Sequence, residues 1–133
     1  MISVIEQLDV HKTVLQCTNA ALKKKAKNLV ILKVNGITSF TDYFIVCSGT
    51  SDRQVKGIAA SIQEELKKAG TQPLGIEGEN TGNWILMDYG DVIIHIFYEP
   101  TREFYDIERL WADAPCMPVG ETVTTLTSLN EDM

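Results

Sequence analysis

Two apolar segments joined by one short turn constrain this chain more than any other feature. Residues 84–87 and 92–97 are apolar apart from His95, and the sequence Asp-Tyr-Gly-Asp lies between them. A Gly-Asp pair between two apolar segments is typical of a two-residue β-hairpin turn. The sequence therefore predicts an antiparallel hairpin whose turn lies at Gly90 and Asp91.

The register set by this turn divides the hairpin into two faces, because successive side chains of a strand point to opposite sides. One face is nearly all apolar and is expected to lie in the core; it comprises Ile85, Met87, Tyr89, Val92, Ile94 and Ile96. The other is apolar but carries a carboxylate and an imidazole; it comprises Trp84, Leu86, Asp88, Ile93, His95 and Phe97. Either a helix or the C-terminal segment covers this second face, or a partner binds it, since central aromatic residues with a charged rim are typical of protein interfaces.

Two long helices are expected outside the hairpin. Leucines recur at intervals of seven over residues 8–22, and the lysines of residues 23–27 close this helix, where cations favour the C-terminus. These lysines also suit contact with phosphate, although the helix end explains them as well. A second helix begins after Ser51, which stands three residues before Gln54 in the spacing of a capping box, and it ends at Gly70.

Three further strands and one short helix complete the pattern. Residues 29–34 and 43–48 predict two strands, the second of them central because both its faces are apolar. Residues 73–77 are expected at a sheet edge, because proline is confined to edges and strand starts. After the hairpin, Thr101 is expected to cap a final helix whose inward side chains are Phe104, Ile107, Leu110 and Trp111.

This order of elements predicts an α/β fold with a mixed five-stranded sheet and helices mainly on one side. Because the two long helices cover one side, only the short final helix remains for the other, which favours partial exposure of the face that carries Trp84. Residues 1–114 are expected to form one domain. Residues 115–133 are mostly polar and are expected to be a mobile C-terminal tail.

The charges are distributed unevenly along the chain. Residues 77–113 carry nine acidic and two basic side chains, whereas residues 1–76 carry ten basic and six acidic ones. Nucleic acid binds basic surfaces, so the acidic segment is not expected to bind DNA directly. It suits a basic protein partner, or else it is a solvated surface that keeps the protein soluble.

Composition excludes several other classes of protein. No apolar stretch approaches the ~20 residues that span a bilayer, and the N-terminal residues lack the pattern of a secretory signal. Cys17, Cys47 and Cys116 are an odd number of cysteines with no close pair, which favours reduced thiols and a cytoplasmic protein. No membrane association is expected.

The sequence gives little support to catalysis. A metal site needs three or four converging ligands, and His11 and His95 stand far apart among scattered cysteines. The sequence Ser-Gly-Thr-Ser at residues 48–51 is similar to the glycine-serine turn of nucleotidyltransferases, but no Asp-x-Asp follows to bind Mg²⁺. We therefore expect no enzyme, cofactor or metal site; a nucleotide-binding or nucleotidyltransferase-type enzyme built on this turn is the alternative.

Several short motifs in a fixed order resemble those of the Iojap family of ribosomal silencing factors. They cover the chain from about Asp9 to Ala114 and comprise DYFIVCSGTS at 42–51, RQV at 53–55, Glu77-Gly78, Trp84, DYGDVIIHIF at 88–97, REFY at 102–105 and Leu110-Trp111. Each motif is weak by itself, and their ordered combination is strong.

The resemblance implies a nucleotidyltransferase-like α/β domain without catalytic activity, usually a homodimer. It further implies a translational repressor that binds the large ribosomal subunit through its fourteenth protein and blocks association with the small subunit under nutrient limitation. The partner-binding residues that it implies are Trp84, Leu86, Asp88, Tyr89, Gly90 and Asp91, which we extend to His95 and Phe97. A further alternative is a plain dimerisation module whose aromatic face is self-complementary.

Overall fold

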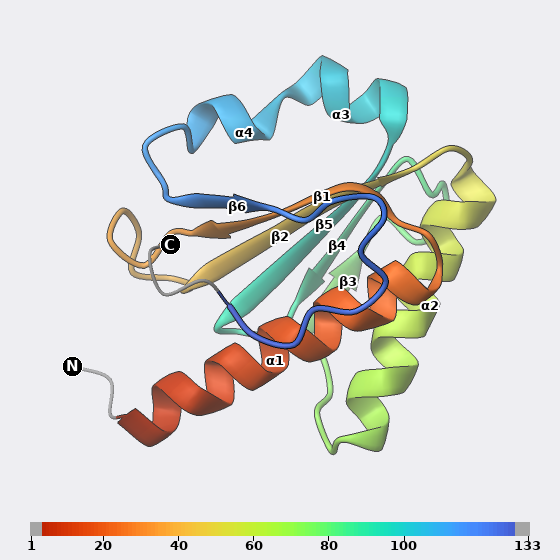
Figure 1. Cartoon of the computed structure of the whole chain (residues 1–133). Coiled ribbons are helices and arrows are strands. Elements are labelled where there is room, and N and C mark those ends of the chain that lie inside the picture. Colours follow the sequence, from red (N-terminus) through yellow and green to blue (C-terminus); the bar gives the residue numbers. More distant parts are fainter. Residues whose placement is uncertain (1–3, 130–133) are drawn as a thin grey trace.

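The computed structural model describes residues 4–129, with side chains from residue 8 onward, and contains a six-stranded sheet (Figure 1). The strand order is β3-β4-β5-β2-β1-β6, and only β2 and β5 run parallel. The strands are β1 (Lys27–Lys33), β2 (Tyr43–Gly49), β3 (Gly75–Glu77), β4 (Trp84–Asp88), β5 (Val92–Tyr98) and β6 (Cys116–Pro118). The predicted mixed α/β sheet is confirmed, with one more strand than expected.

The interior position of β2 and the edge position of β3 both follow from their sequences. All seven residues of β2 are buried, which agrees with a strand that is apolar on both faces. The short strand β3 follows Pro73 and pairs only with β4, at one edge of the sheet.

The hairpin of β4 and β5 has the predicted register. Trp84 pairs with Phe97 and Asp88 with Ile93, as a turn at Gly90 and Asp91 requires. Gly90 adopts a φ of 85°, a conformation that favours glycine. The expected division of the hairpin into two faces is therefore correct.

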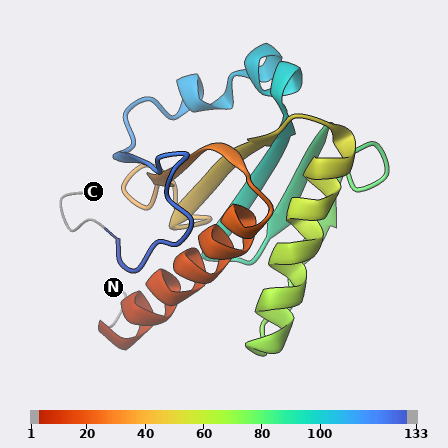
Figure 2. The same cartoon turned by 45° about the vertical axis from the view of Figure 1, so that its right-hand side comes forward.

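One side of the sheet is closed by α1 (Val4–Lys23) and α2 (Asp52–Lys68), which lie next to each other in Figure 2. The main core cluster lies between these helices and the sheet and takes in the predicted core face of the hairpin. Of the predicted leucine stripe of α1, Leu22 is buried, whereas Leu8 is exposed and Leu15 is only half-buried. The helix also buries smaller side chains against the sheet: Val10, Val14, Cys17 and Ala21.

Within α2 the predicted cap is present. The backbone N–H of Gln54 donates to the Ser51 hydroxyl at 3.1 Å. The side chain of Gln54 does not return to Ser51, however; its Oε1 accepts from the backbone N–H of Thr50 at 2.7 Å. Two N–H groups at the start of α2, those of Thr50 and Gln54, thus have partners within the turn.

On the other side of the sheet, α3 (Glu99–Tyr105) and α4 (Ile107–Leu110) form a narrow bridge, seen above the sheet in Figure 1. The prediction of one helix capped by Thr101 was wrong, because the N-cap is Tyr98 and Asp106, at a φ of 46°, divides the segment in two. Contrary to expectation, Phe104 and Leu110 point outward and are 79% and 80% exposed, whereas Ile107, directly after the break, is buried.

The segment from residue 115 onward differs from the expected mobile tail. Strand β6 pairs with β1, and Val119 is buried in the main core cluster. Further on, Asn19 of α1 and the backbone of Leu126 exchange two hydrogen bonds, of 3.1 Å and 2.7 Å. The chain to residue 129 therefore packs along α1 and extends the predicted domain of residues 1–114.

The three cysteines differ in their burial. Cys17 and Cys47 are buried, and burial raises the pKa of Cys47 to about 12, whereas Cys116 is exposed.

Among residues 4–129, no helix is both long enough and apolar enough to span a bilayer.

Candidate functional site

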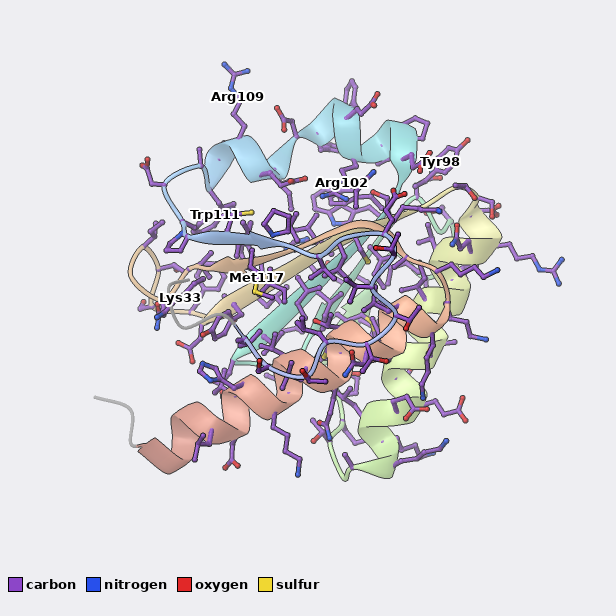
Figure 3. All side chains as sticks on the ribbon, viewed as in Figure 1. Lys33, Tyr98, Arg102, Arg109, Trp111 and Met117 are labelled. Carbon is purple, nitrogen blue, oxygen red and sulfur yellow. The ribbon has the colours of Figure 1, made fainter. Side chains whose placement is uncertain are left out.

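An aromatic cluster fills the space between the sheet and the bridge of α3 and α4. Trp84 lies at its centre, stacked on Phe97 with ring centroids 4.8 Å apart and 5.0 Å from the ring of Tyr105. Phe44 of β2 lies 4.8 Å from Trp111, which follows α4 and is labelled in Figure 3. Such contacts stabilise each pair by ~1 kcal/mol beyond the area that they bury. The hairpin, β2 and the bridge thus form one rigid aromatic layer.

The hydrogen bond between Trp84 and His95 fixes the orientation of the indole. Trp84 Nε1 donates to His95 Nδ1 at 3.2 Å, and because an indole nitrogen only donates, Nδ1 must be unprotonated. Burial lowers the pKa of His95 to about 4, so the ring is neutral near pH 7 and its proton lies on Nε2. Nε2 is buried without a hydrogen-bond partner in the described structure. His95 therefore acts as an acceptor that holds Trp84.

Part of the Trp84 side of the hairpin is accessible. Trp84, Leu86 and Asp88 are half-buried. Glu77 of β3 pairs with Leu86, so its exposed side chain lies on the same side of the sheet. We call these four residues the hairpin face; it combines an indole, an aliphatic side chain and two carboxylates.

The eight predicted partner-binding residues fall into four groups, the first of which, Trp84, Leu86 and Asp88, belongs to the hairpin face. Phe97 has no exposed surface and His95 is 6% exposed, so neither can be a direct contact; both support Trp84 from below. Tyr89 lies on the opposite side of the sheet and packs against the main core cluster. Gly90 and Asp91 lie at the hairpin tip, where the Gly90 N–H donates to Asp88 Oδ1 at 2.8 Å.

Two features around Trp84 shape the site further. Gly78 adopts a φ of 85°, and a Cβ there would overlap the Trp84 carbonyl oxygen, so the approach of the β3–β4 loop requires glycine. A pocket of ≈ 570 Å³ opens beside the indole, between this loop and α3. Its lining residues are Thr81, Asn83, Trp84, Tyr98, Pro100, Thr101, Phe104 and Tyr105.

Arg102 holds the bridge onto the sheet. Its Nη1 donates to the Asn28 carbonyl at 2.8 Å and to the Ser48 hydroxyl at 2.9 Å, while Nε contacts Glu108 at 2.7 Å. Figure 3 shows Arg102 lying between α3 and the sheet, whereas Arg109 points away from the molecule. Arg102 thereby places α3, and with it Tyr105, against Trp84.

The turn at residues 48–51, from which the enzyme alternative was built, is internally bonded. The Ser48 hydroxyl binds Arg102, the Ser51 hydroxyl caps α2, and the Thr50 N–H binds Gln54. In the described part of the chain, no three His, Cys, Asp or Glu side chains converge as metal ligands would. The Ser48 and Ser51 hydroxyls and the Thr50 N–H therefore already have partners within the protein.

Sequence reasoning missed Glu77 and Tyr105 as neighbours of the predicted site. Glu77 comes to the hairpin face through the pairing of β3 with β4, and Tyr105 contacts Trp84 from the last turn of α3. Both residues belong to motifs of the family resemblance, but no local signal indicated that they lie beside Trp84.

An α/β domain with this topology has solved counterparts. A crystal structure of a protein from Chromobacterium violaceum matches the fold with a TM-score of 0.76 and 36% sequence identity, covering 86% of this chain and 97% of that one. At this identity the likeness extends to sequence as well as to fold.

Family comparisons agree with that likeness. The model of the family described as "ribosomal silencing factor during starvation" matches residues 7–132. The ribosomal silencing factor of Bacillus subtilis is 39% identical over 106 residues, which are 79% of this chain and 90% of that protein. The Haemophilus influenzae counterpart is 46% identical over 88 residues, which are 66% and 86% of the two chains. This chain belongs to the ribosomal silencing factor family, whose names describe a regulatory factor rather than an enzyme.

Proposed function

We propose that this protein represses translation in the cytoplasm by binding the fourteenth protein of the large ribosomal subunit and blocking association with the small subunit under nutrient limitation. The observation that carries the proposal is the hairpin face, where a half-buried indole is held by a buried histidine and flanked by carboxylates. Membership of the family supports a ribosomal partner.

The chemistry of the hairpin face suits a basic protein surface. Asp88 and Glu77 flank Leu86, and Asp91 adds a carboxylate at the hairpin tip. Carboxylates at a rim steer a cationic partner and fix its orientation, while the desolvated aromatic centre supplies most of the affinity. Because Trp84 is already stacked and hydrogen-bonded, little conformational entropy is lost when a partner covers it.

Sedimentation with purified large subunits tests this proposal. The wild-type protein is expected to co-sediment at low salt, and Trp84→Ala to bind more weakly by ~2 kcal/mol, or about 30-fold, because a central aromatic anchor is lost. Leu8→Ala is the control, since Leu8 is an exposed apolar residue of α1, on the opposite side of the sheet from Trp84. Circular dichroism shows whether each variant is folded.

Two results would contradict the proposal. If the wild-type protein does not co-sediment with large subunits at low salt, the ribosomal partner is wrong. If folded Trp84→Ala binds as tightly as Leu8→Ala, the hairpin face is not the binding surface. Calorimetry with ATP and Mg²⁺ tests the enzyme alternative, which gains support if binding is detected and Asp52→Asn abolishes it.

The protein is further proposed to be a homodimer, and its interface must leave Trp84 free. Indole fluorescence of a Trp111→Phe variant reports on Trp84 alone, because the chain has two tryptophans. Its emission is expected to stay constant while the protein is diluted through the dimer–monomer transition. A shift on dilution would indicate that two copies bury Trp84 between them and that the aromatic face is a dimer interface.

A further inference from the structure

A basic patch lies where the end of α1 meets the start of α2, and nothing in the proposed contact with a ribosomal protein uses it. It comprises four exposed side chains: Lys24, Lys25, Arg53 and Lys56. None of the four forms an ion pair with another described residue. The patch therefore carries unneutralised positive charge on a chain whose net charge is −6.

Hydrogen bonds hold the backbone of the patch in place. Gln54 Nε2 donates to the carbonyls of Lys24 and Lys25, each at 3.1 Å, and so joins the turn that follows α1 to the first turn of α2. Lys24 and Gly57 also line the same shallow hollow between the two helices. Arg53 precedes Gln54, so three of the four cations belong to one hydrogen-bonded unit.

Acidic neighbours offset little of this charge. Asp52 lies in the first turn of α2, where a carboxylate stabilises the helix. Glu64 and Glu65 lie further along α2 and pair with Lys68 and Lys23. The partial positive charge at the start of α2 adds to that of the patch.

The patch extends to the loop that precedes Trp84. Lys56 extends beside Gly82, since a Cβ at Gly82 would lie 3.1 Å from Lys56 Cε. Gly82 belongs to the loop that leads into Trp84. Figure 2 shows this loop next to the first turns of α2. When a partner covers Trp84, the molecules next to that partner therefore lie close to the patch.

We propose that the basic patch contacts phosphates of ribosomal RNA while the hairpin face contacts the ribosomal protein; this inference rests on the proposed function. The patch suits a phosphate backbone because all four of its side chains are exposed cations. A membrane surface or the centre of a protein interface would need apolar side chains there. In this arrangement the acidic hairpin face contacts the protein part of the ribosomal surface, and the basic patch contacts its RNA.

A pair of charge reversals with equal change in net charge tests this assignment. Lys24→Glu/Arg53→Glu removes two cations of the patch, and the control Lys12→Glu/Lys67→Glu reverses two exposed lysines outside it. On large subunits at ~0.1 M salt, the patch variant is expected to bind about tenfold or more weakly than the control. Its plot of log affinity against log salt is expected to be shallower by about 2, because each lost phosphate contact removes about 0.9.

Two further measurements separate this inference from the proposed function. The isolated fourteenth protein is expected to bind wild type, patch variant and control equally, and loss of that binding in the wild type would refute the proposed function itself. Ultraviolet crosslinking on large subunits is expected to join the wild type, but not the patch variant, to ribosomal RNA. The inference is wrong if patch and control variants bind subunits equally, or if the patch crosslinks only to protein.

Discussion

The two sides of the sheet are built from similar strands but differ in how completely they are covered. On the side of α1 and α2, strand side chains such as Ile85, Met87 and Ile94 are at most 1% exposed. On the side of α3 and α4, only a narrow bridge crosses the sheet, and Trp84 and Leu86 are left half-buried. We expect the first side to carry most of the stability, because its side chains are more completely buried, and the second to present the accessible surface.

The largest effect is expected from neighbouring truncations on opposite sides of β4. Ile85→Ala removes a side chain from the closed side and is expected to lower the free energy of unfolding by about 3 kcal/mol, because a cavity remains. Leu86→Ala, on the open side, is expected to cost less than about 1 kcal/mol. Denaturant titration measures both, and equal losses would mean that the two sides contribute alike to stability.

Acid is expected to act on the open side through His95. Its pKa is about 4 in the folded protein and about 6.5 when unfolded, so the unfolded chain binds more protons between these values. Stability is therefore full above pH 6.5, and about 3 kcal/mol is lost as the pH falls to 4. His95→Gln is expected to flatten this part of the curve of unfolding free energy against pH. An unchanged slope, with His11→Gln as control, would contradict the role of His95.

A smaller effect is expected from the bridge itself. Arg102→Gln removes the contacts to Asn28, Ser48 and Glu108 and is expected to lower the free energy of unfolding by about 2 kcal/mol. Arg109→Gln is the matched control, because Arg109 is exposed, and it is expected to change stability by less than about 0.5 kcal/mol. Thermal unfolding followed by Trp84 fluorescence in the Trp111→Phe background compares them. Equal melting temperatures would show that the bridge does not depend on Arg102.

Local signals predicted much of the fold because they act within a few residues. The Gly90–Asp91 turn fixed the register of the hairpin, and the apolar faces of residues 43–48 indicated a central strand. The cap at Ser51 is likewise a contact between residues three apart. Strand β6 left no such signal, because three residues become a strand only by pairing with the distant β1.

The candidate site was predicted in its strand residues and missed in its surroundings. Alternation along β4 identified Trp84, Leu86 and Asp88 on one side. It did not reveal that Phe97 is fully covered, because Trp84 stacks on it and because Ile107 and Trp111, which follow the break at Asp106, pack in the same cluster. The left-handed conformation of Asp106 changes which side chains face the sheet, and the helical period gave no warning of it.

The sequence by itself determined that the hairpin has two faces, because side-chain alternation is a property of every strand. It also determined the register, because the turn residues set it locally. Only the tertiary structure decided which face is closed and how far the other remains open. That depends on contacts between residues far apart in the chain, such as those of Arg102 with Asn28 and Ser48, which no local pattern encodes.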